Sequence, residues 1–201
     1  MKSYEEHTDY IKQKEYEVAE TIIASMNDCY DITQLGDFAE VAYNRVVDMF
    51  DFDDFDSCKH LTMVGCGPFP MTVLHIINKY PDMKIDAIDI DPEAISITEK
   101  LIKQLGLQAS VKLHCNNGLD HDYSASSIVY IANLVRPKAK VLDTVWKNCE
   151  KSTLVVLRDP TKAGDDYAES GLSSVDERFN IEGFGTDDST FHSRHVFLRC
   201  Q

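Results

Sequence analysis

The sequence has 201 residues with 43% hydrophobic side chains, and its 34 acidic and 20 basic residues give a net charge of −14. This composition is typical of one globular domain with a full core, and the negative charge argues against a nucleic-acid partner. No apolar run approaches the roughly 20 residues of a membrane span, and the N-terminal residues are too acidic for a signal peptide, so we expect a cytoplasmic protein without membrane contact.

Two segments with apolar residues at helical spacing come first in the chain, at about residues 4–27 and 37–50. We expect them to form a helical lid, with residues 1–56 as lid and linker and residues 57–201 as the sheet domain. The acidic run at residues 51–56 ends the linker. Calcium binding there is an alternative, but the run lacks the glycine and the terminal Glu of a calcium loop.

The stretch at residues 61–91 predicts a strand, a glycine turn, a helix and a second strand. Gly65, Cys66 and Gly67 form the turn, and Asp89 ends the second strand. Glycine suits a place where the chain turns sharply or a ligand comes too close for a Cβ atom. A carboxylate about 20 residues further on can accept hydrogen bonds from both ribose hydroxyls. We therefore predict a nucleoside site, although an ordinary strand–helix turn is the alternative.

The residues after the turn distinguish a nucleoside from a dinucleotide. Pro70 occupies the position where a dinucleotide fingerprint has its third glycine. Pro68 and Pro70 also remove two backbone N–H donors from the segment where a pyrophosphate would bind. The turn thus favours a nucleoside with few phosphates, and S-adenosylmethionine (SAM) is one.

The third predicted strand, at residues 111–115, follows a helix that begins at Asp91 and Pro92 and ends near Gly106. Asn117 comes directly after this strand. Its side-chain oxygen is placed to accept a hydrogen bond from the adenine amine. An Asn-Gly turn selected for positive φ explains the same residue equally well.

Further strands are predicted at residues 127–131 and 153–157, with a helix between them. The alternation indicates a parallel α/β sheet with ligands at its carboxyl edge, where Asn133 and Arg158 also lie. Alternating apolar runs at residues 179–184 and 191–200 predict a final hairpin. A mostly parallel sheet with an antiparallel C-terminal strand and an N-terminal helical lid is typical of the Rossmann-like class I SAM-methyltransferase fold.

Within this fold the chain most resembles nicotianamine synthase and its relatives, over roughly residues 60–160. V-G-C-G-P-F-P at residues 64–70 is similar to the family's V-G-S-G-P-L-P, and D-I-D-P at 89–92 is similar to its D-I-D-P. I-A-N-L-V at 131–135 and L-R at 157–158 are similar to its L-A-A-L-V and L-R. The chain departs from the family in being shorter ahead of the glycine turn, and in having Ala42-Tyr43 where the family has a Glu-Tyr pair.

The resemblance implies a SAM-dependent small-molecule transferase in which the γ-carbon of the aminocarboxypropyl group is attacked and methylthioadenosine is released. The nucleophile is either a separate acceptor or the α-amine of SAM, which would cyclise to azetidine-2-carboxylate. A methyltransferase that acts on a small molecule and releases S-adenosylhomocysteine is the alternative. A non-catalytic SAM-binding subunit is a second alternative. The oligomeric state stays open.

The expected site combines residues from the strand ends and from the lid. We expect SAM to be bound by Gly65, Cys66, Gly67, Asp89, Ile90, Asn117 and Ile131. The nucleophile has to be deprotonated, so we look for a base on the lid among Tyr10, Tyr16, Glu17, Glu40 and Tyr43. The catalytic candidates are Tyr43, Glu17 and Asn133.

The cysteines and histidines do not have the spacings of a metal site. The six cysteines lack a CxxC pair, which favours reduced thiols over disulfides or zinc ligands. His192 and His195 lie three apart in a predicted strand and so point to opposite faces. We therefore expect no metal.

Overall fold

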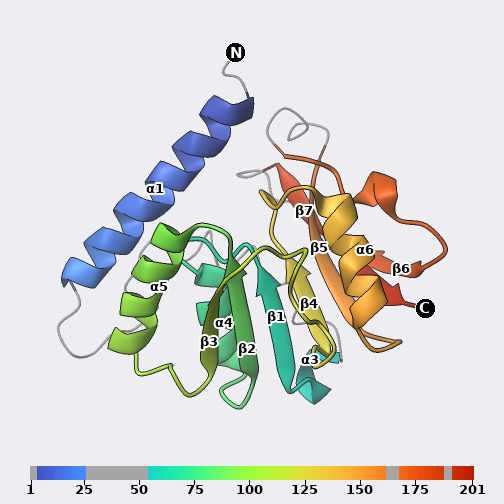
Figure 1. The fold of residues 1–201 in the computed structure, drawn as a ribbon, viewed down its shortest axis with the longest axis horizontal. Coiled ribbons are helices and arrows are strands. Elements are labelled where there is room, and N and C mark those ends of the chain that lie inside the picture. Colours follow the sequence, from blue (N-terminus) through green and yellow to red (C-terminus); the bar gives the residue numbers. More distant parts are fainter. Residues whose placement is uncertain (1–3, 26–53, 162–167, 188–191) are drawn as a thin grey trace.

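The computed structural model describes residues 4–25, 54–161, 168–187 and 192–201. Within these ranges one sheet has the strand order β3-β2-β1-β4-β5-β7-β6 (Figure 1). The strands are β1 (His60–Val64), β2 (Lys84–Asp89), β3 (Val111–Cys115), β4 (Ile128–Ile131), β5 (Leu154–Pro160), β6 (Phe179–Phe184) and β7 (Ser193–Cys200). The helices are α1 (Tyr4–Ser25), α3 (Asp54–Ser57), α4 (Met71–Lys79), α5 (Pro92–Gln104), α6 (Lys138–Asn148) and the short 3-10 helix η4 (Leu172–Ser174).

The first five strands pair in parallel, whereas β7 runs antiparallel to both β5 and β6. The predicted class I SAM-methyltransferase fold is therefore confirmed. The strand β1 pairs with β2 on one side and with β4 on the other, so the strand order reverses at β1. Ligands of open α/β sheets bind at such a reversal, beyond the carboxyl ends of the strands.

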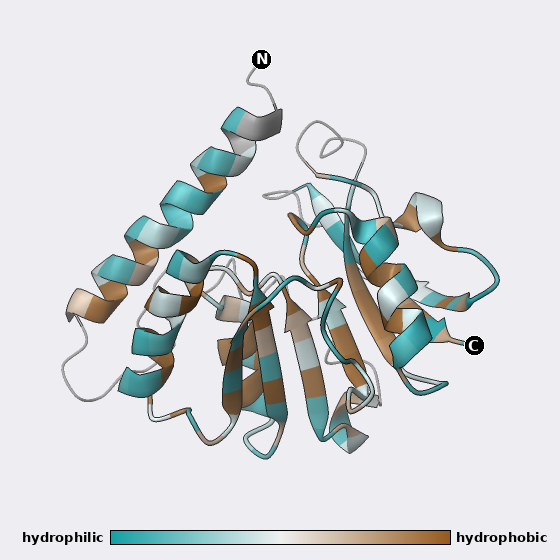
Figure 2. Cartoon of the chain, in the orientation of Figure 1, coloured by the Kyte–Doolittle hydropathy of each residue, from teal (hydrophilic) through white to brown (hydrophobic). Residues whose placement is uncertain are grey.

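Helices cover both faces of the sheet. Residues of α1, α4 and α5 pack with Leu61 and Met63 of β1 on one face, and residues of α6 pack with Val64 on the other. The hydrophobic residues concentrate in the strands, while α1, α5 and α6 carry many hydrophilic residues (Figure 2). The strand β5 is buried along its whole length, as expected for a central strand covered on both faces.

The helix α5 begins and ends where its sequence predicts. The side chain of Asp91 caps it by accepting a hydrogen bond from the Glu93 amide at 3.0 Å, and Pro92 occupies the first turn. After its last residue, Gly106 adopts a left-handed φ of 68°. The cap places the start of α5 directly after Asp91, two residues beyond Asp89, which ends β2.

The first predicted helix is confirmed as α1, which lies along α5 (Figure 1). Ala19 and Ile22 of α1 are buried in the core, and the Tyr16 hydroxyl donates a hydrogen bond to Asp91 at 3.1 Å. The second predicted helix, at residues 37–50, lies outside the described residues. The division at residue 56 stays a prediction. None of the described helices combines the length and hydropathy needed to span a membrane.

Candidate active site

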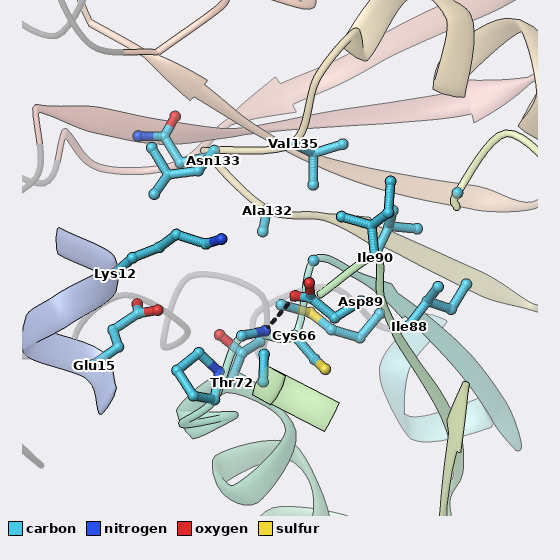
Figure 3. Close-up of a pocket in the computed structure, with 18 of the residues that line it drawn as sticks. Lys12, Glu15, Cys66, Thr72, Ile88, Asp89, Ile90, Ala132, Asn133 and Val135 are labelled. Atoms are coloured by element: carbon cyan, nitrogen blue, oxygen red, sulfur yellow. Dashed lines mark hydrogen bonds between the residues drawn. The ribbon is translucent and has the colours of Figure 1, made fainter. Parts of the chain in front are cut away.

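A cavity of about 400 Å³ lies at the carboxyl ends of β1, β2 and β4. Its size falls within the range of small-molecule sites, roughly 300–1,000 Å³. Helix α1 contributes Thr8, Asp9, Ile11, Lys12 and Glu15 to its wall. Figure 3 shows Lys12 and Glu15 pointing from α1 toward the cavity. The N-terminal helix therefore helps to enclose the site.

The glycine turn forms one wall of the cavity, and both glycines have left-handed φ angles, 80° at Gly65 and 67° at Gly67. A Cβ atom on Gly65 would lie 2.6 Å from Cγ2 of Val135. A Cβ atom on Gly67 would lie 3.0 Å from Oε2 of Glu15. The amides of Gly65 and Cys66 both donate to the carbonyl of Ile88, at 2.9 and 3.0 Å. Glycine is thus required here by backbone conformation and by close neighbours.

The carboxylate of Asp89 lines the cavity and is fixed by two backbone amides. Its Oδ2 accepts from the Gly67 amide at 2.8 Å (Figure 3), and its Oδ1 accepts from the Asp91 amide at 3.0 Å. Ile90 lies beside it with 68% of its surface exposed, which leaves an apolar face at the cavity. A carboxylate can accept hydrogen bonds from the hydroxyls of a ribose, and an apolar face beside it can contact an adenine.

Cys66 also lines the cavity, but its thiol is buried. Burial raises the pKa of Cys66 well above its ordinary value, and the negative charge of Asp89 adds to this effect. The protonated thiol is a poor nucleophile, so Cys66 contributes shape rather than reactivity.

The loop after β3 brings Asn116, Asn117 and Gly118 to the cavity. The Asn117 Oδ1 atom accepts a hydrogen bond from the Leu119 amide at 3.0 Å, and Asn116 Oδ1 accepts from the Asn117 amide at 2.8 Å. Asn117 does not have a positive φ, which excludes the positive-φ explanation of this residue. The hydrogen bonds from backbone amides to the two side-chain oxygens explain the asparagines instead. A Cβ atom on Gly118 would lie 2.7 Å from Cγ1 of Val64, so close packing on β1 requires that glycine.

The loop after β4 contributes Asn133, whose Oδ1 atom is buried and has no hydrogen-bond partner among the described residues. A buried acceptor that lacks a partner costs free energy, and a ligand with a donor would satisfy it. Ile131 differs from the expectation, since it does not line the cavity and is buried on the α6 side of the sheet. The alternation of side chains along a strand places its neighbours Tyr130 and Ala132 at the cavity instead.

Arg158 reaches the cavity from the carboxyl half of β5 and is buried. Its Nε and Nη2 atoms donate to the Ser193 hydroxyl of β7 at 3.0 and 2.7 Å. The antiparallel strand thus orients a cation at the cavity. Lys12 adds another cation, and its ion pair with Asp91 at 3.0 Å raises the pKa of the Lys12 ammonium.

The residues proposed as a base on the lid differ in whether they reach the cavity. Glu17 is exposed on α1, accepts hydrogen bonds from Gln13 and Lys14, and does not line the cavity. Tyr43 and Glu40 lie outside the described residues. Two other carboxylates of α1, Asp9 and Glu15, line the cavity, and Glu15 is the glutamate that the sequence did not single out. A signal for it exists: Thr8, Ile11, Lys12 and Glu15 follow the spacing of one helical face.

The chain is similar to known proteins in family and in fold. A family model described as nicotianamine synthase protein matches residues 42–186. No curated protein sequence matches the chain.

Solved structures with the same fold include a glutamate-to-glutamine mutant of MtNAS in complex with S-adenosylmethionine, with a TM-score of 0.81, 15% identity, and coverage of 98% of this chain and 76% of that one. MtNAS in complex with MTA and tNA has a TM-score of 0.78, 18% identity, and coverage of 93% and 70%. The mitomycin 7-O-methyltransferase MmcR has a TM-score of 0.65, 12% identity, and coverage of 83% and 55%. At these identities the likeness to the solved structures shows the fold.

Proposed function

Because the chain belongs to the nicotianamine synthase protein family, we propose that it is a SAM-dependent transferase that moves the aminocarboxypropyl group of SAM. The observation that carries the proposal is the cavity at the carboxyl ends of β1, β2 and β4. The glycine turn, Asp89 and the Asn133 oxygen all line it, and this oxygen has no hydrogen-bond partner in the part of the chain that the structure describes. The acceptor is a small molecule or SAM itself. The negative net charge supports a small-molecule partner rather than a nucleic acid, and we place the reaction in the cytoplasm.

The residues at the cavity fit the two ends of SAM. Asp89 would accept hydrogen bonds from the ribose, and Ile90 would contact the adenine through its exposed apolar face. The amino-acid end carries a carboxylate and an amino group. Arg158 offers a guanidinium to the carboxylate, and Asn133 Oδ1 offers an acceptor to the amino group. The cavity carboxylates Asp9, Glu15 and Asp89 favour the positive sulfonium.

In the reaction, the nucleophilic nitrogen forms a bond to the γ-carbon, the bond from that carbon to sulfur breaks, and methylthioadenosine leaves. The nitrogen loses a proton, which a base has to accept. Glu15 is our candidate for this base, because it is the glutamate of α1 that lines the cavity. Tyr43 stays a candidate from the sequence.

The test is an incubation of the purified full chain with SAM alone and then with small amines, followed by mass spectrometry. We expect methylthioadenosine. Azetidine-2-carboxylate formed without an added amine would identify cyclisation, whereas an amine that carries the aminocarboxypropyl group would identify transfer to an acceptor. S-adenosylhomocysteine as the product would overturn the proposal in favour of a methyltransferase. Binding of SAM without any product would favour the non-catalytic subunit.

A further inference from the structure

Two cysteines that are 51 positions apart in the sequence meet at the end of the sheet opposite the cavity. Cys149 directly follows α6, and Cys200 is the last residue of β7. Their Sγ atoms lie 3.2 Å apart and share a hydrogen bond. Neither residue lines the cavity. None of the five cysteines among the described residues forms a disulfide in the structure, and the sequence spacing does not reveal this pair.

Backbone hydrogen bonds hold both thiols in place. The Ser152 amide donates to the Cys200 carbonyl at 3.0 Å, and the Cys200 amide donates to the Thr153 carbonyl at 3.1 Å. The Cys149 amide donates to the Val145 carbonyl of α6 at 2.8 Å. A disulfide has a sulfur–sulfur bond of about 2.05 Å, so the two sulfurs need to approach by only about 1 Å. The fold therefore presents a preassembled thiol pair.

The two thiols differ in reactivity. Cys149 is half-buried, whereas Cys200 is buried. The hydrogen bond with the Cys200 thiol lowers the pKa of Cys149, and the Lys151 ammonium adds to this effect. The same hydrogen bond raises the pKa of Cys200. The thiolate is the reactive form of cysteine, so Cys149 is the residue that a peroxide would oxidise first.

We propose that Cys149 and Cys200 are a modification site at which hydrogen peroxide forms a reversible disulfide between α6 and β7. The Cys149 thiolate attacks one peroxide oxygen, the oxygen–oxygen bond breaks, and a sulfenic acid and hydroxide form. The hydroxide becomes water by taking up the proton that the Cys149 thiol released on ionising. The Cys200 sulfur then attacks the sulfenic sulfur, the sulfur–oxygen bond breaks, and a second water leaves with the Cys200 proton. The two sulfurs together lose two electrons, which the peroxide gains.

The disulfide raises the stability of the fold and leaves the cavity unchanged. It closes a loop that contains β5, β6 and β7, and such a link restricts the unfolded chain. We expect oxidation to raise the midpoint of thermal unfolding and to leave the affinity for SAM unchanged. The proposal does not depend on the transferase function.

The experiment treats the full chain with hydrogen peroxide, maps its peptides by mass spectrometry without reductant, and records thermal unfolding before and after dithiothreitol. We expect a Cys149–Cys200 peptide and a raised midpoint that dithiothreitol reverses. Cys149→Ser should abolish the shift, while Cys115→Ser, which removes an exposed thiol at the end of β3, should retain it.

The peptide map of the peroxide-treated protein without substitutions decides the question even if a variant folds poorly. Free thiols at both positions, a sulfinic acid at Cys149, or a bond from Cys149 to another cysteine would each overturn the proposal. A raised midpoint in peroxide-treated Cys149→Ser would also contradict it.

Discussion

The Asp89 carboxylate accepts a hydrogen bond from the Gly67 amide at 2.8 Å, so the acidic residue that ends β2 also holds the glycine turn that follows β1. Its second oxygen is held by the Asp91 amide at 3.0 Å. The two strands pair in parallel, which brings the two ends together. The carboxylate is thus oriented before any ligand arrives, and a ligand that binds it loses little free energy in ordering it.

Asp89→Ala should weaken SAM binding by roughly 1–3 kcal/mol, or about 5- to 150-fold in the dissociation constant, because a charged hydrogen-bond acceptor is lost. Isothermal calorimetry with SAM, S-adenosylhomocysteine and NAD measures this change. Asp82→Ala is the control, because Asp82 is exposed in the turn before β2. An unchanged affinity of the Asp89 variant, or tighter binding of NAD than of SAM, would contradict the assignment.

Gly67→Ala and Gly106→Ala form a matched pair. Their φ angles are 67° and 68°, so each alanine should cost about 1–2 kcal/mol of unfolding free energy. A Cβ atom at Gly106 would meet no described residue within 4 Å, whereas one at Gly67 would meet the Glu15 carboxylate at 3.0 Å. We expect only Gly67→Ala to reduce SAM affinity. Equal affinities of the two variants would mean that the contact between α1 and the turn is unimportant for binding.

Glu15→Gln should lower kcat for methylthioadenosine formation by about 100-fold or more, the usual effect of losing a general base. The change keeps the size of the side chain and removes its ability to accept a proton. Glu17→Gln on the exposed side of α1 is the control and should keep full activity. If Glu15→Gln retains normal turnover, the base lies elsewhere, and Tyr43→Phe is the next variant to measure.

Lys138 should make stability depend on pH above neutrality. The side chain is buried at the start of α6, where its Nζ donates to the Glu169 carbonyl at 2.6 Å, and burial lowers its pKa from 10.5 to about 8. Between these values the unfolded chain keeps a proton that the folded chain has lost. The free energy of unfolding should therefore rise as the pH increases from about 8 toward 10.

Urea unfolding at several pH values measures this slope. In Lys138→Met the rise should be flatter than in the original sequence, whereas Lys140→Met, an exposed position on the same helix, should leave it unchanged. An identical slope in Lys138→Met would show that the lysine stays protonated in the fold throughout this range.

The sequence alone determined most of the fold, because its signals are local. Apolar runs, the cap at Asp91 and the stop at Gly106 depend on neighbouring residues, and the structure has the corresponding strands and α5 where they were predicted. The glycine turn and Asp89 are also signals that can be read from one short segment of the sequence. Consecutive parallel strands usually lie side by side, so the segment at residues 61–91 already indicates that the glycine turn and Asp89 lie close together.

Only the tertiary structure decided which residues of distant segments meet. It placed Glu15 rather than Glu17 at the cavity, because that choice depends on the face that α1 turns toward the sheet. It brought Ser193 to Arg158 and Cys200 to Cys149, because β7 pairs with β5 instead of simply following β6 at the edge. Pairing between strands far apart in the chain depends on how the whole core packs, and no local pattern records it.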